Sequence, residues 1–496
     1  MTLVPETAPR VLFAYRDDVD LRGGAATVMH QTVAALEQLG VRTQVSVEVE
    51  PCVDGFDVVH PVNIWSPHSA LQQMRHLHAT GAPIAWQPFY LHWCEYAWAS
   101  LCLQLVGAPN RTPEERAKLV EGMRSGAMEV NGLTRWLPNE VIPGLHAAIG
   151  EMAALADHIC ACSSREMQML SQTCFVHAKP FTLTRHGVEA SAFAAADPAP
   201  FRALVGDGDY VLCVGSIDTR KNQALLAHAL AGTEHRLVLL GPCFEPETLR
   251  VVRELAGPRM THIERVPREM VASALAGASA HALPSFAEGS ALASMEAAAA
   301  GCPVVVSNRS SEFEYYGDLA VYCDPVDPGS IRRAVDEAVR RRREEPELLD
   351  ELRRHVTTFT WEAAAEATLV AYRRAISAGR RRVRAACWMR DVRATAVLAH
   401  ADELCGDPEL LSAYGARVGA ADEVTLVIAT PPGAEPALEA AVTAAGLTGE
   451  GSPDMVAVAD SELLPRAVDA VLTRRPLAGA LAHLGAVDVT RAAAGV

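Results

Sequence analysis

Residues 284–306 read PSFAEGSALASMEAAAAGCPVVV. This segment predicts a strand that ends at Pro284, followed by a loop that carries Glu288. A helix then begins near Ser290, and the next strand covers Pro303–Ser307. Strand, loop, helix and strand in this order are typical of a parallel sheet with crossover helices. The backbone N–H groups at such a helix start lack partners and carry partial positive charge, so they can receive a phosphate or a sugar hydroxyl.

The same alternation of short apolar runs and amphipathic helices extends on both sides of this segment and predicts two doubly wound α/β domains, residues 1–195 and 205–360. The stretch between them, Ala190–Ala203, has the Ala, Asp and Pro content of a linker. Two such sheets place a cleft where the carboxyl ends of their strands meet. A helical insertion at about residues 105–155 interrupts the first alternation. The predicted strands are Val11–Tyr15, Thr43–Val47, Asp57–His60, Ile84–Gln87, His158–Cys162 and Phe181–Arg185, then Tyr210–Val214, Arg236–Leu240, Thr261–Val266, His281–Pro284, Pro303–Ser307 and Ala320–Cys323.

The remaining third of the sequence changes character. Thr360–Ile376 predicts a long helix inside a crossover segment, residues 360–378. Residues 391–496 are rich in alanine and predict a small accessory α/β module without evident catalytic groups. Its strands include Val424–Ala429 and Met455–Val458.

Composition and charge exclude several classes of protein. A net charge of −16 argues against a nucleic-acid-binding protein, whose footprint would be basic. The N-terminal MTLVPETAPR lacks the pattern of a signal peptide, and the longest apolar run, Ala297–Val306, is too short to span a bilayer. Twelve scattered cysteines without a CxxC pair favour reduced thiols over a zinc site. We therefore expect a cytoplasmic protein without a metal or other cofactor. The basic run Arg380–Arg384 is interpreted as a linker, with peripheral contact at the inner face of the membrane as the alternative.

A second chemical signal lies in Val211–Asn222, which predicts a buried strand, a turn and a helix start that carries Arg220 beside Lys221. The planar fork of arginine binds phosphate oxygens and lysine supplies a point charge, so the two together can stabilise a diphosphate. A solvated pair at the helix start is the alternative, but cations there oppose the helix dipole.

The two segments together resemble the retaining GT-B glycosyltransferases, in particular glycosyltransferase family 4 (glycosyl transferases group 1), whose E-x7-E motif matches Glu288 and Glu296. The resemblance covers Val11–Ile376 and implies two Rossmann-like domains that face each other across a cleft. It implies that Glu288 contacts the donor sugar and that Glu296 holds the ribose hydroxyls. It also implies that Arg220 and Lys221 act with Glu288 in catalysis by neutralising the donor diphosphate. A surface loop before an ordinary alanine-rich helix is the alternative interpretation. The further donor-binding candidates are Gly289, Ser290, Ala291, Leu292, Gly215, Val266, Gly23 and Gly24.

Some of these positions are weaker matches to the family. Gly23 and Gly24 follow the first strand, where glycines let the backbone approach a ligand and where relatives have a glycine loop. Val266 lies where relatives recognise the base through backbone groups. Ser216 stands where the family often has arginine, so Arg220 is expected to supply that charge from a neighbouring position.

The acceptor side of the cleft has the weakest signal. Many relatives carry a histidine after the strand Ile84–Gln87, close to the reacting sugar; here the aligned place falls at Phe89, and His92 lies three residues on. Gln87, Tyr90 and His92 are the acceptor-side candidates, and core packing of the aromatic residues is the alternative.

Two other histidines lie at strand ends. His60 is interpreted as a satisfied strand-end histidine rather than a catalyst. His186 and Gly187 occupy the place of an Asn-Gly turn in relatives, and the glycine indicates a left-handed turn. Contact of this turn with a ligand stays open.

The resemblance implies transfer of a sugar, with retention of anomeric configuration, from a UDP- or GDP-sugar to a hydroxyl of an acceptor such as a surface glycan, glycolipid, natural product or protein. No Asp-x-Asp metal motif follows a strand, so Arg220, Lys221 and the helix start near Ser290 are expected to stabilise the leaving diphosphate. Three alternatives remain: a catalytically silent GT-B-fold subunit that supports a partner transferase, a nucleotide-sugar epimerase, and a biological role defined by the C-terminal module as an interaction domain. The oligomeric state is open.

Overall fold

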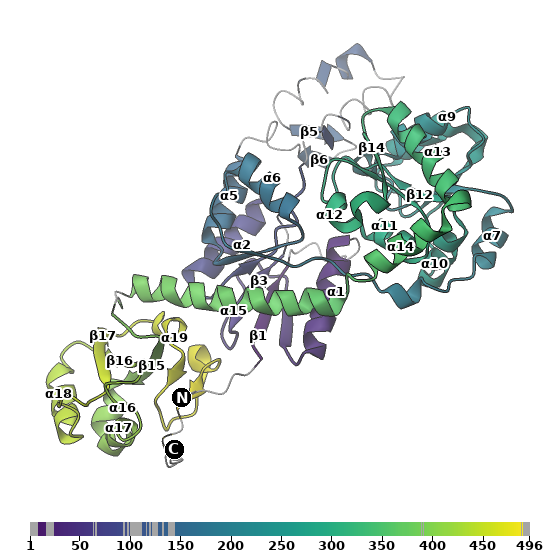
Figure 1. Cartoon of the computed structure of the whole chain (residues 1–496). Coiled ribbons are helices and arrows are strands. Elements are labelled where there is room, and N and C mark those ends of the chain that lie inside the picture. The colour runs from purple at the N-terminus through teal and green to yellow at the C-terminus, as the bar shows by residue number, and fades with distance from the viewer. Residues whose placement is uncertain are drawn as a thin grey trace.

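The computed structural model describes residues 8–15, 24–62, 67–92, 144–387 and 391–487, residues 64, 389 and 489, and the short pieces 95–96, 99, 112–115, 117–118, 121, 127–130 and 133–136. Figure 1 shows three lobes in a row. The N-terminal domain lies in the middle, a second Rossmann-like domain lies on one side of it, and a small module lies on the other.

The N-terminal domain is built on a parallel sheet whose strands lie in the order β2, β1, β3, β4, β7, β8. Single bridges at Val59–Ile84 and Val62–Gln87 join its two three-stranded pieces. Each strand lies within three residues of its predicted position. For the central strands β1, β3 and β7 the reason is a nearly continuous buried run, which marks strands covered on both faces. The strands are β1 (Arg10–Ala14), β2 (Arg42–Ser46), β3 (Val58–Pro61), β4 (Ala85–Trp86), β7 (His158–Ala161) and β8 (Phe181–Leu183). The helices are α1 (Gly24–Gln38), α2 (Pro67–Ala79), α5 (Leu145–Leu155) and α6 (Ser164–Cys174).

The insertion predicted to be helical at residues 105–155 is only partly so. It contains an antiparallel pair, β5 (Ala127–Val130) and β6 (Leu133–Trp136), before α5. β-Branched and aromatic residues such as Thr134 and Trp136 are typical of strands. The sequence interpretation gave more weight to the helical pattern of this stretch and did not predict the pair of strands.

The second domain contains a six-stranded parallel sheet in the order β11, β10, β9, β12, β13, β14. The order reverses between β9 and β12, so the loops after these two strands flank one crevice at the carboxyl edge. The strands are β9 (Val211–Val214), β10 (Leu237–Leu240), β11 (Met260–Ile263), β12 (Ala280–Leu283), β13 (Val304–Ser307) and β14 (Val321–Cys323). The helices are η2 (Thr219–Lys221), α8 (Gln223–Leu230), α9 (Pro246–Ala256), η3 (Gly257–Arg259), α10 (Arg268–Gly277), α11 (Leu292–Ala299), α12 (Glu312–Tyr316), η4 (Gly317–Leu319), α13 (Pro328–Glu344) and α14 (Pro346–Val356).

The linker predicted at Ala190–Ala203 is an ordered part of the second domain. It holds η1 (Ala190–Ala192) and the first half of α7 (Ala199–Val205). Phe193 and Phe201 are buried in the same apolar cluster as residues of β9, β10 and β13, which explains why this stretch is structured despite its composition.

Helix α15 (Trp361–Ala386) crosses from the second domain along the N-terminal domain to the module (Figure 1). The sequence predicts its start correctly, with the Thr360 hydroxyl accepting the Ala363 N–H as a cap. The helix then runs ten residues past the predicted end at Ile376, so the interpretation of Arg380–Arg384 as a linker is wrong. These arginines lie in the last turns of a helix packed against both neighbours.

The arginines of this last part of α15 hold two lobes together. Arg382 donates to both carboxylate oxygens of Asp157 in the N-terminal domain, at 2.9 and 3.0 Å. Arg380 and Arg384 both pair with Asp469 in the module. Guanidinium groups engaged in this way bridge domains, which is the physical reason for their clustering.

The C-terminal module is a five-stranded parallel sheet in the order β17, β16, β15, β18, β19. Arg466 fixes it to the N-terminal domain, because its buried guanidinium donates to the carbonyls of Val53 and Phe56 at 2.6 Å each. The strands are β15 (Thr395–His400), β16 (Val424–Thr430), β17 (Asp454–Ala459), β18 (Ala470–Val471) and β19 (Gly485–Ala486). The helices are α16 (Ala401–Gly406), α17 (Pro408–Gly415), α18 (Glu435–Ala444), α19 (Leu464–Ala467) and η5 (Gly479–Leu481).

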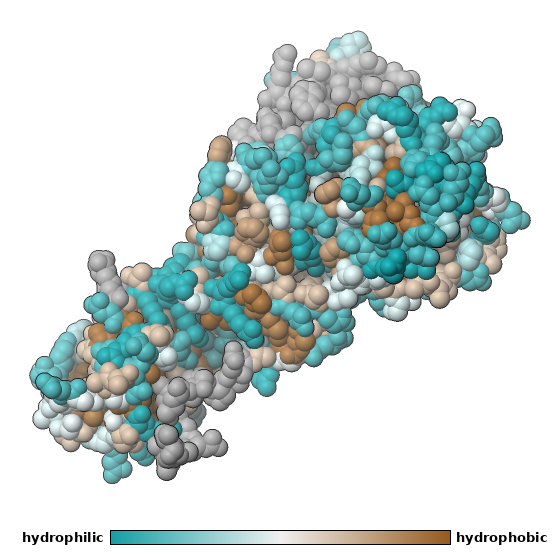
Figure 2. Space-filling model, in the orientation of Figure 1, coloured by the Kyte–Doolittle hydropathy of each residue, from teal (hydrophilic) through white to brown (hydrophobic). Residues whose placement is uncertain are grey.

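The surface is mixed in character. Figure 2 shows apolar colour in separate patches among hydrophilic residues. Large exposed apolar side chains, such as Phe175, Phe244 and Phe313, are spread over different elements. None of the helices described is long and apolar enough to cross a membrane.

Candidate active site

The site predicted from sequence assembles at the carboxyl edge of the second sheet, where the strand order reverses. β9 leads into the loop that carries Arg220 and Lys221, and its neighbour β12 leads into the loop that carries Glu288. The Phe286 N–H donates to the carbonyl of Arg220 at 2.9 Å, so the two loops are joined through their backbones. Residues 68 positions apart in sequence are thereby brought into one group.

The loop after β9 depends on close backbone packing. Gly215 has φ 154°, and a Cβ atom there would lie 3.4 Å from Cε of Lys221, so the lysine side chain passes directly over this residue. A Cβ atom at Gly241, after β10, would meet the carbonyl oxygen of Gly215 at 2.1 Å. The Asp218 side chain accepts the Lys221 N–H at 2.9 Å and begins the short η2 helix. These contacts fix the two cations at the crevice.

Glu288 forms the centre of the charge cluster. Its Oε1 atom accepts from Lys221 Nζ at 2.6 Å and from Arg220 Nη1 at 2.8 Å. The side chains are largely shielded, with 9% of Glu288 and 12% of Lys221 exposed. Burial alone would raise the pKa of Glu288, but Lys221 and Arg220 hold it down at about 2. Glu288 is therefore ionised throughout the neutral range.

Helix α11 begins directly after the loop that carries Glu288. The helix begins at Leu292, two residues later than predicted, and no side chain caps it. Ala291 precedes it with φ 51° and ψ 64°, a left-handed conformation that alanine rarely adopts. The carbonyl of Ser290 is held by the hydroxyl of Tyr316 at 3.0 Å. The uncapped N–H groups and the helix dipole give this point an affinity for negative charge.

Glu296, the second carboxylate of the motif, has a different environment from Glu288. It lies partly buried in α11, and no hydrogen bond or ion pair reaches its carboxylate within the part of the chain that the structure describes. Burial raises its pKa to about 7, an effect that Arg268 opposes and Glu189 reinforces. Arg268 itself is engaged with Glu189 at 2.9 Å. Glu296 is therefore a carboxylate available to a ligand.

The remaining donor-side candidates lie around this centre. Val266 is partly buried after β11, at the same carboxyl edge. Gly24 begins α1 after β1, whereas Gly23 lies outside the described residues. Ser216, where relatives often have arginine, donates to Asp218 at 2.5 Å and so supports the loop rather than a ligand.

The three acceptor-side candidates lie in different environments. Gln87 is buried, and its Oε1 atom has no partner among the described residues. Tyr90 lies in the core: its hydroxyl bonds Thr173 at 2.6 Å and its N–H donates to Glu166. The core-packing alternative therefore holds for Tyr90, and stacking of its ring on an acceptor sugar does not fit. His92 lies partly exposed in the following loop.

The prediction that His60 is a satisfied core histidine holds for one ring nitrogen only, because its buried Nε2 atom has no hydrogen-bond partner among the described residues. Its Nδ1 atom lies 2.7 Å from the hydroxyl of Tyr372 in α15, and its ring stacks on Phe13. Burial lowers its pKa to about 3. A neutral histidine locked between β1 and α15 serves the core.

Contacts between the two domains were not predicted. Glu314 accepts the backbone N–H groups of Ser164 and Arg165 at 3.0 and 2.7 Å, so a carboxylate of one domain caps helix α6 of the other. Arg309 donates to Glu95 across the cleft, with the shorter contact at 2.9 Å. A local sequence pattern carries no sign of such pairs, because the partners lie about 150 and 214 positions apart.

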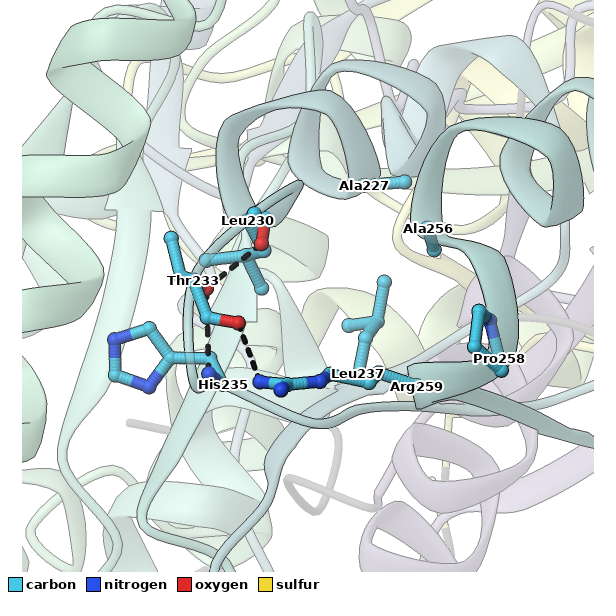
Figure 3. Close-up of a pocket in the computed structure, with 9 residues that line it drawn as sticks. Ala227, Leu230, Thr233, His235, Leu237, Ala256, Pro258 and Arg259 are labelled. Atoms are coloured by element: carbon cyan, nitrogen blue, oxygen red, sulfur yellow. Dashed lines mark hydrogen bonds between the residues drawn. The ribbon is translucent and has the colours of Figure 1, made fainter.

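A separate pocket of about 230 Å³ lies between α8, α9 and η3 (Figure 3). Its wall includes Thr233 and Leu237, which precede or begin β10, so it opens at the amino edge of the sheet. Arg259 in its rim donates to the carbonyl of Thr233 at 2.7 Å and to Glu234. The pocket lies at the opposite edge of the sheet from Glu288 and is not part of the candidate site.

Known proteins with sequence similarity to this chain are glycosyltransferases. Residues 200–356 match the family model of glycosyl transferases group 1. The O-antigen chain mannosyltransferase B of Escherichia coli is 31% identical over 183 residues, 33% of this chain and 45% of that protein. The chain spans about half the length of the curated relatives it matches.

Two solved structures show the likeness in three dimensions. Sucrose-phosphate synthase (tll1590) from Thermosynechococcus elongatus has a TM-score of 0.56 at 16% identity, over 73% of this chain and 98% of that one. Anabaena Alr3699/HepE in complex with UDP-glucose has a TM-score of 0.50 at 12% identity, over 73% and 98%. The predicted GT-B fold is confirmed, and the chain carries a glycosyl transferases group 1 domain at residues 200–356.

Proposed function

We propose that this protein is a retaining, metal-independent glycosyltransferase of the family 4 type, which moves a sugar from a UDP- or GDP-sugar to an acceptor hydroxyl. One observation carries the proposal. Two carboxylates eight positions apart flank the open start of α11, Glu288 bound to two cations and Glu296 without a partner among the described residues. This arrangement offers separate groups for the sugar, the diphosphate and the ribose of one extended donor.

The cation cluster suits a diphosphate that arrives with the donor. Without ligand, the Glu288 carboxylate neutralises Arg220 and Lys221. A diphosphate carries more negative charge than one carboxylate and can compete for the same N–H donors, together with the uncapped end of α11. Glu288 would then be able to accept a hydrogen bond from a sugar hydroxyl.

The chemistry follows from these positions. The bond between the anomeric carbon and the diphosphate oxygen breaks, and a bond from the acceptor oxygen to that carbon forms on the same face. The acceptor proton passes to the departing diphosphate. Lys221 and Arg220 stabilise the developing charge, a contribution worth about 3 kcal/mol for one well-placed donor.

Glu296 supports the assignment of the nucleotide end. A carboxylate accepts hydrogen bonds from two neighbouring hydroxyls, as the 2′ and 3′ positions of ribose provide. Because burial raises the pKa of Glu296 to about 7, we expect nucleotide affinity to increase as the pH rises through neutrality and the carboxylate ionises.

The test is thermal stabilisation by UDP, GDP, dTDP and their glucose or mannose conjugates, with and without EDTA. A nucleotide present at 100 times its dissociation constant stabilises the protein by about 2.7 kcal/mol. We expect one nucleotide to raise the melting temperature of the wild type in EDTA but not that of Glu296→Ala. A Glu366→Ala variant, changed on the exposed face of α15, serves as the control. Absence of any nucleotide effect would contradict the proposal.

The catalytically silent subunit is favoured by one observation, the aromatic ring of Phe89 at the place of the family's histidine. Donor binding alone does not separate the two functions. Release of nucleotide with a glycosylated product supports the transferase, and NMR of the anomeric centre tests retention. Binding without turnover for any acceptor hydroxyl, alone or with partner proteins, supports the silent subunit.

A further inference from the structure

His186 enters the donor site from the N-terminal domain. It follows β8, and the next residue, Gly187, packs against the start of α15 so closely that a Cβ atom would lie 2.4 Å from the Trp361 nitrogen. Gly187 does not have a positive φ, so the predicted left-handed turn is wrong and close approach explains the glycine. The Val188 N–H donates to the Phe359 carbonyl at 2.9 Å. The backbone that carries His186 is therefore fixed on both sides.

The imidazole ring is held in one orientation. Its Nδ1 atom lies 2.8 Å from Oγ of Ser290, in the loop between Glu288 and α11. Phe89 contacts the ring edge-on, with 5.5 Å between centroids. The backbone N–H of His186 donates to the hydroxyl of Tyr315 at 3.1 Å. Ser290 and Phe89, one from each domain, thus hold the ring, while Tyr315 holds the backbone that carries it.

The second ring nitrogen has no partner. Nε2 of His186 is buried and makes no hydrogen bond within the part of the chain that the structure describes. The Cε1 atom, between the two nitrogens, lies 3.9 Å from the position of a Cβ atom at Gly289, so this edge of the ring borders the donor loop. A buried nitrogen left without a partner destabilises the folded protein. Such a cost is expected where a ligand later supplies the partner.

The charge state fits a neutral ligand group. Burial lowers the pKa of His186 to about 4, so the ring is neutral at physiological pH. One nitrogen of a neutral imidazole donates and the other accepts. A sugar hydroxyl can take either role, whereas a phosphate oxygen accepts only.

We propose that His186 binds the donor sugar directly, with Nε2 hydrogen-bonded to a sugar hydroxyl beside Gly289. This inference rests on the proposed function and adds a recognition residue from the N-terminal domain to the donor site. Ser290 positions the ring through Nδ1, and Gly289, which lacks a side chain, leaves room for the sugar. Because the sugar would then contact both domains, His186 contributes to the choice of sugar and not of nucleotide.

Two isosteric variants separate the ring nitrogens. The amide of His186→Asn replaces Nδ1 and keeps the contact with Ser290, whereas the amide of His186→Gln replaces Nε2. Calorimetry would compare UDP with UDP-glucose, GDP with GDP-mannose and dTDP with dTDP-glucose. For the pair that binds the wild type, we expect His186→Asn to lose about tenfold in affinity for the nucleotide sugar and to keep its affinity for the nucleotide. His186→Gln should retain most of the sugar affinity.

The control is His158→Asn. His158 is also buried, its pKa is also lowered to about 4, and its Nε2 bonds Thr182 at 2.8 Å at the amino end of β7. The His158→Asn variant should bind the nucleotide and the nucleotide sugar as tightly as the wild type does. Equal losses for nucleotide and nucleotide sugar in His186→Asn, or no loss in either, would overturn the inference while leaving the proposed function intact. Failure of the wild type to bind any of the three pairs would overturn both.

Discussion

The second Rossmann-like domain and the C-terminal module have the same order for five strands: β11, β10, β9, β12 and β13 in one, and β17, β16, β15, β18 and β19 in the other. In both sheets the order reverses beside the first strand, where open α/β sheets bind their ligands. At β9 and β12 this point presents two cations, an ionised carboxylate and an uncapped helix. The equivalent point of the module lies between β15 and β18.

There the module binds its own side chains. Glu403 is buried in the first turn after β15, and its oxygens accept from the hydroxyl of Thr473 and the N–H of Arg474, the latter at 2.9 Å. Arg475 pairs with Asp402 at 3.0 Å. Both acidic side chains lie in the first turn of α16, where their negative charge opposes the binding of a phosphate. The comparison shows that strand order creates the crevice and that the side chains after the strands decide whether a ligand can enter.

The largest effect on turnover is expected at the shielded cation cluster of Arg220 and Lys221. Lys221→Met removes one cation but keeps the chain that lies over Gly215. We expect turnover, measured as nucleotide released, to fall about 10²- to 10³-fold, because one donor to the leaving diphosphate is lost. Arg474→Met at the equivalent edge of the module is the matched control and should leave turnover unchanged. An equal loss of turnover in both variants would show that the two crevices do not differ in function.

The pH dependence of stability tests whether Glu296 is the titrating carboxylate of the second domain. Because burial raises the folded-state pKa of Glu296 from 4.5 to about 7, the folded protein binds a proton more tightly than the unfolded chain. Stability from this group is present below pH 4.5 and is lost as the pH rises to 7. Glu296→Gln should therefore be more stable than the wild type by on the order of 2 kcal/mol at pH 8, and little different at pH 4.5.

Melting curves between pH 4.5 and 8 measure this difference. The exposed Glu366→Gln is the control and should follow the wild type at every pH. The same Glu296→Gln variant should bind nucleotide more weakly. A constant difference across the pH range would mean that Glu296 is not the titrating group.

In the module, a comparable carboxylate is expected to contribute only to stability. Glu403→Ala leaves the Thr473 hydroxyl and the Arg474 N–H without their acceptor, which costs about 1 to 3 kcal/mol. Urea denaturation would measure the loss, and nucleotide binding should be unaffected. Loss of nucleotide binding in a folded Glu403→Ala protein would show that the module takes part in the donor site.

The sequence allowed the grouping of Arg220, Lys221 and Glu288 to be predicted because its signals are local. Glu288 and Glu296 lie eight residues apart on one loop and helix, and Arg220 and Lys221 follow one strand. Most strands are continuous apolar runs, so the order of elements in both domains could be predicted. Local patterns of this kind can be recognised without knowledge of the tertiary structure.

Features that depend on distant partners could not be predicted. The basic run Arg380–Arg384 resembles a solvated linker until Asp157 and Asp469, far away in sequence, are placed beside it. Likewise, a histidine 104 positions from Ser290 shows no local sign that the two side chains meet. The burial of Tyr90 could not be predicted either, because an aromatic loop has the same sequence pattern whether its rings face a sugar or the core.

The smallest effect is expected at the surface ion pair of the module. Arg475 and Asp402 lie 3.0 Å apart, a separation close to that of Lys221 and Glu288, but 57% and 63% of their side chains are exposed. Water and salt screen such a pair, so Arg475→Ala should cost about 0.5 kcal/mol or less and should change neither turnover nor nucleotide binding. Melting temperatures at low and high salt measure the cost. A large, salt-independent loss would show that the module's crevice is as shielded as the donor site. The difference between the two would then have to come from the open carboxylate Glu296 alone.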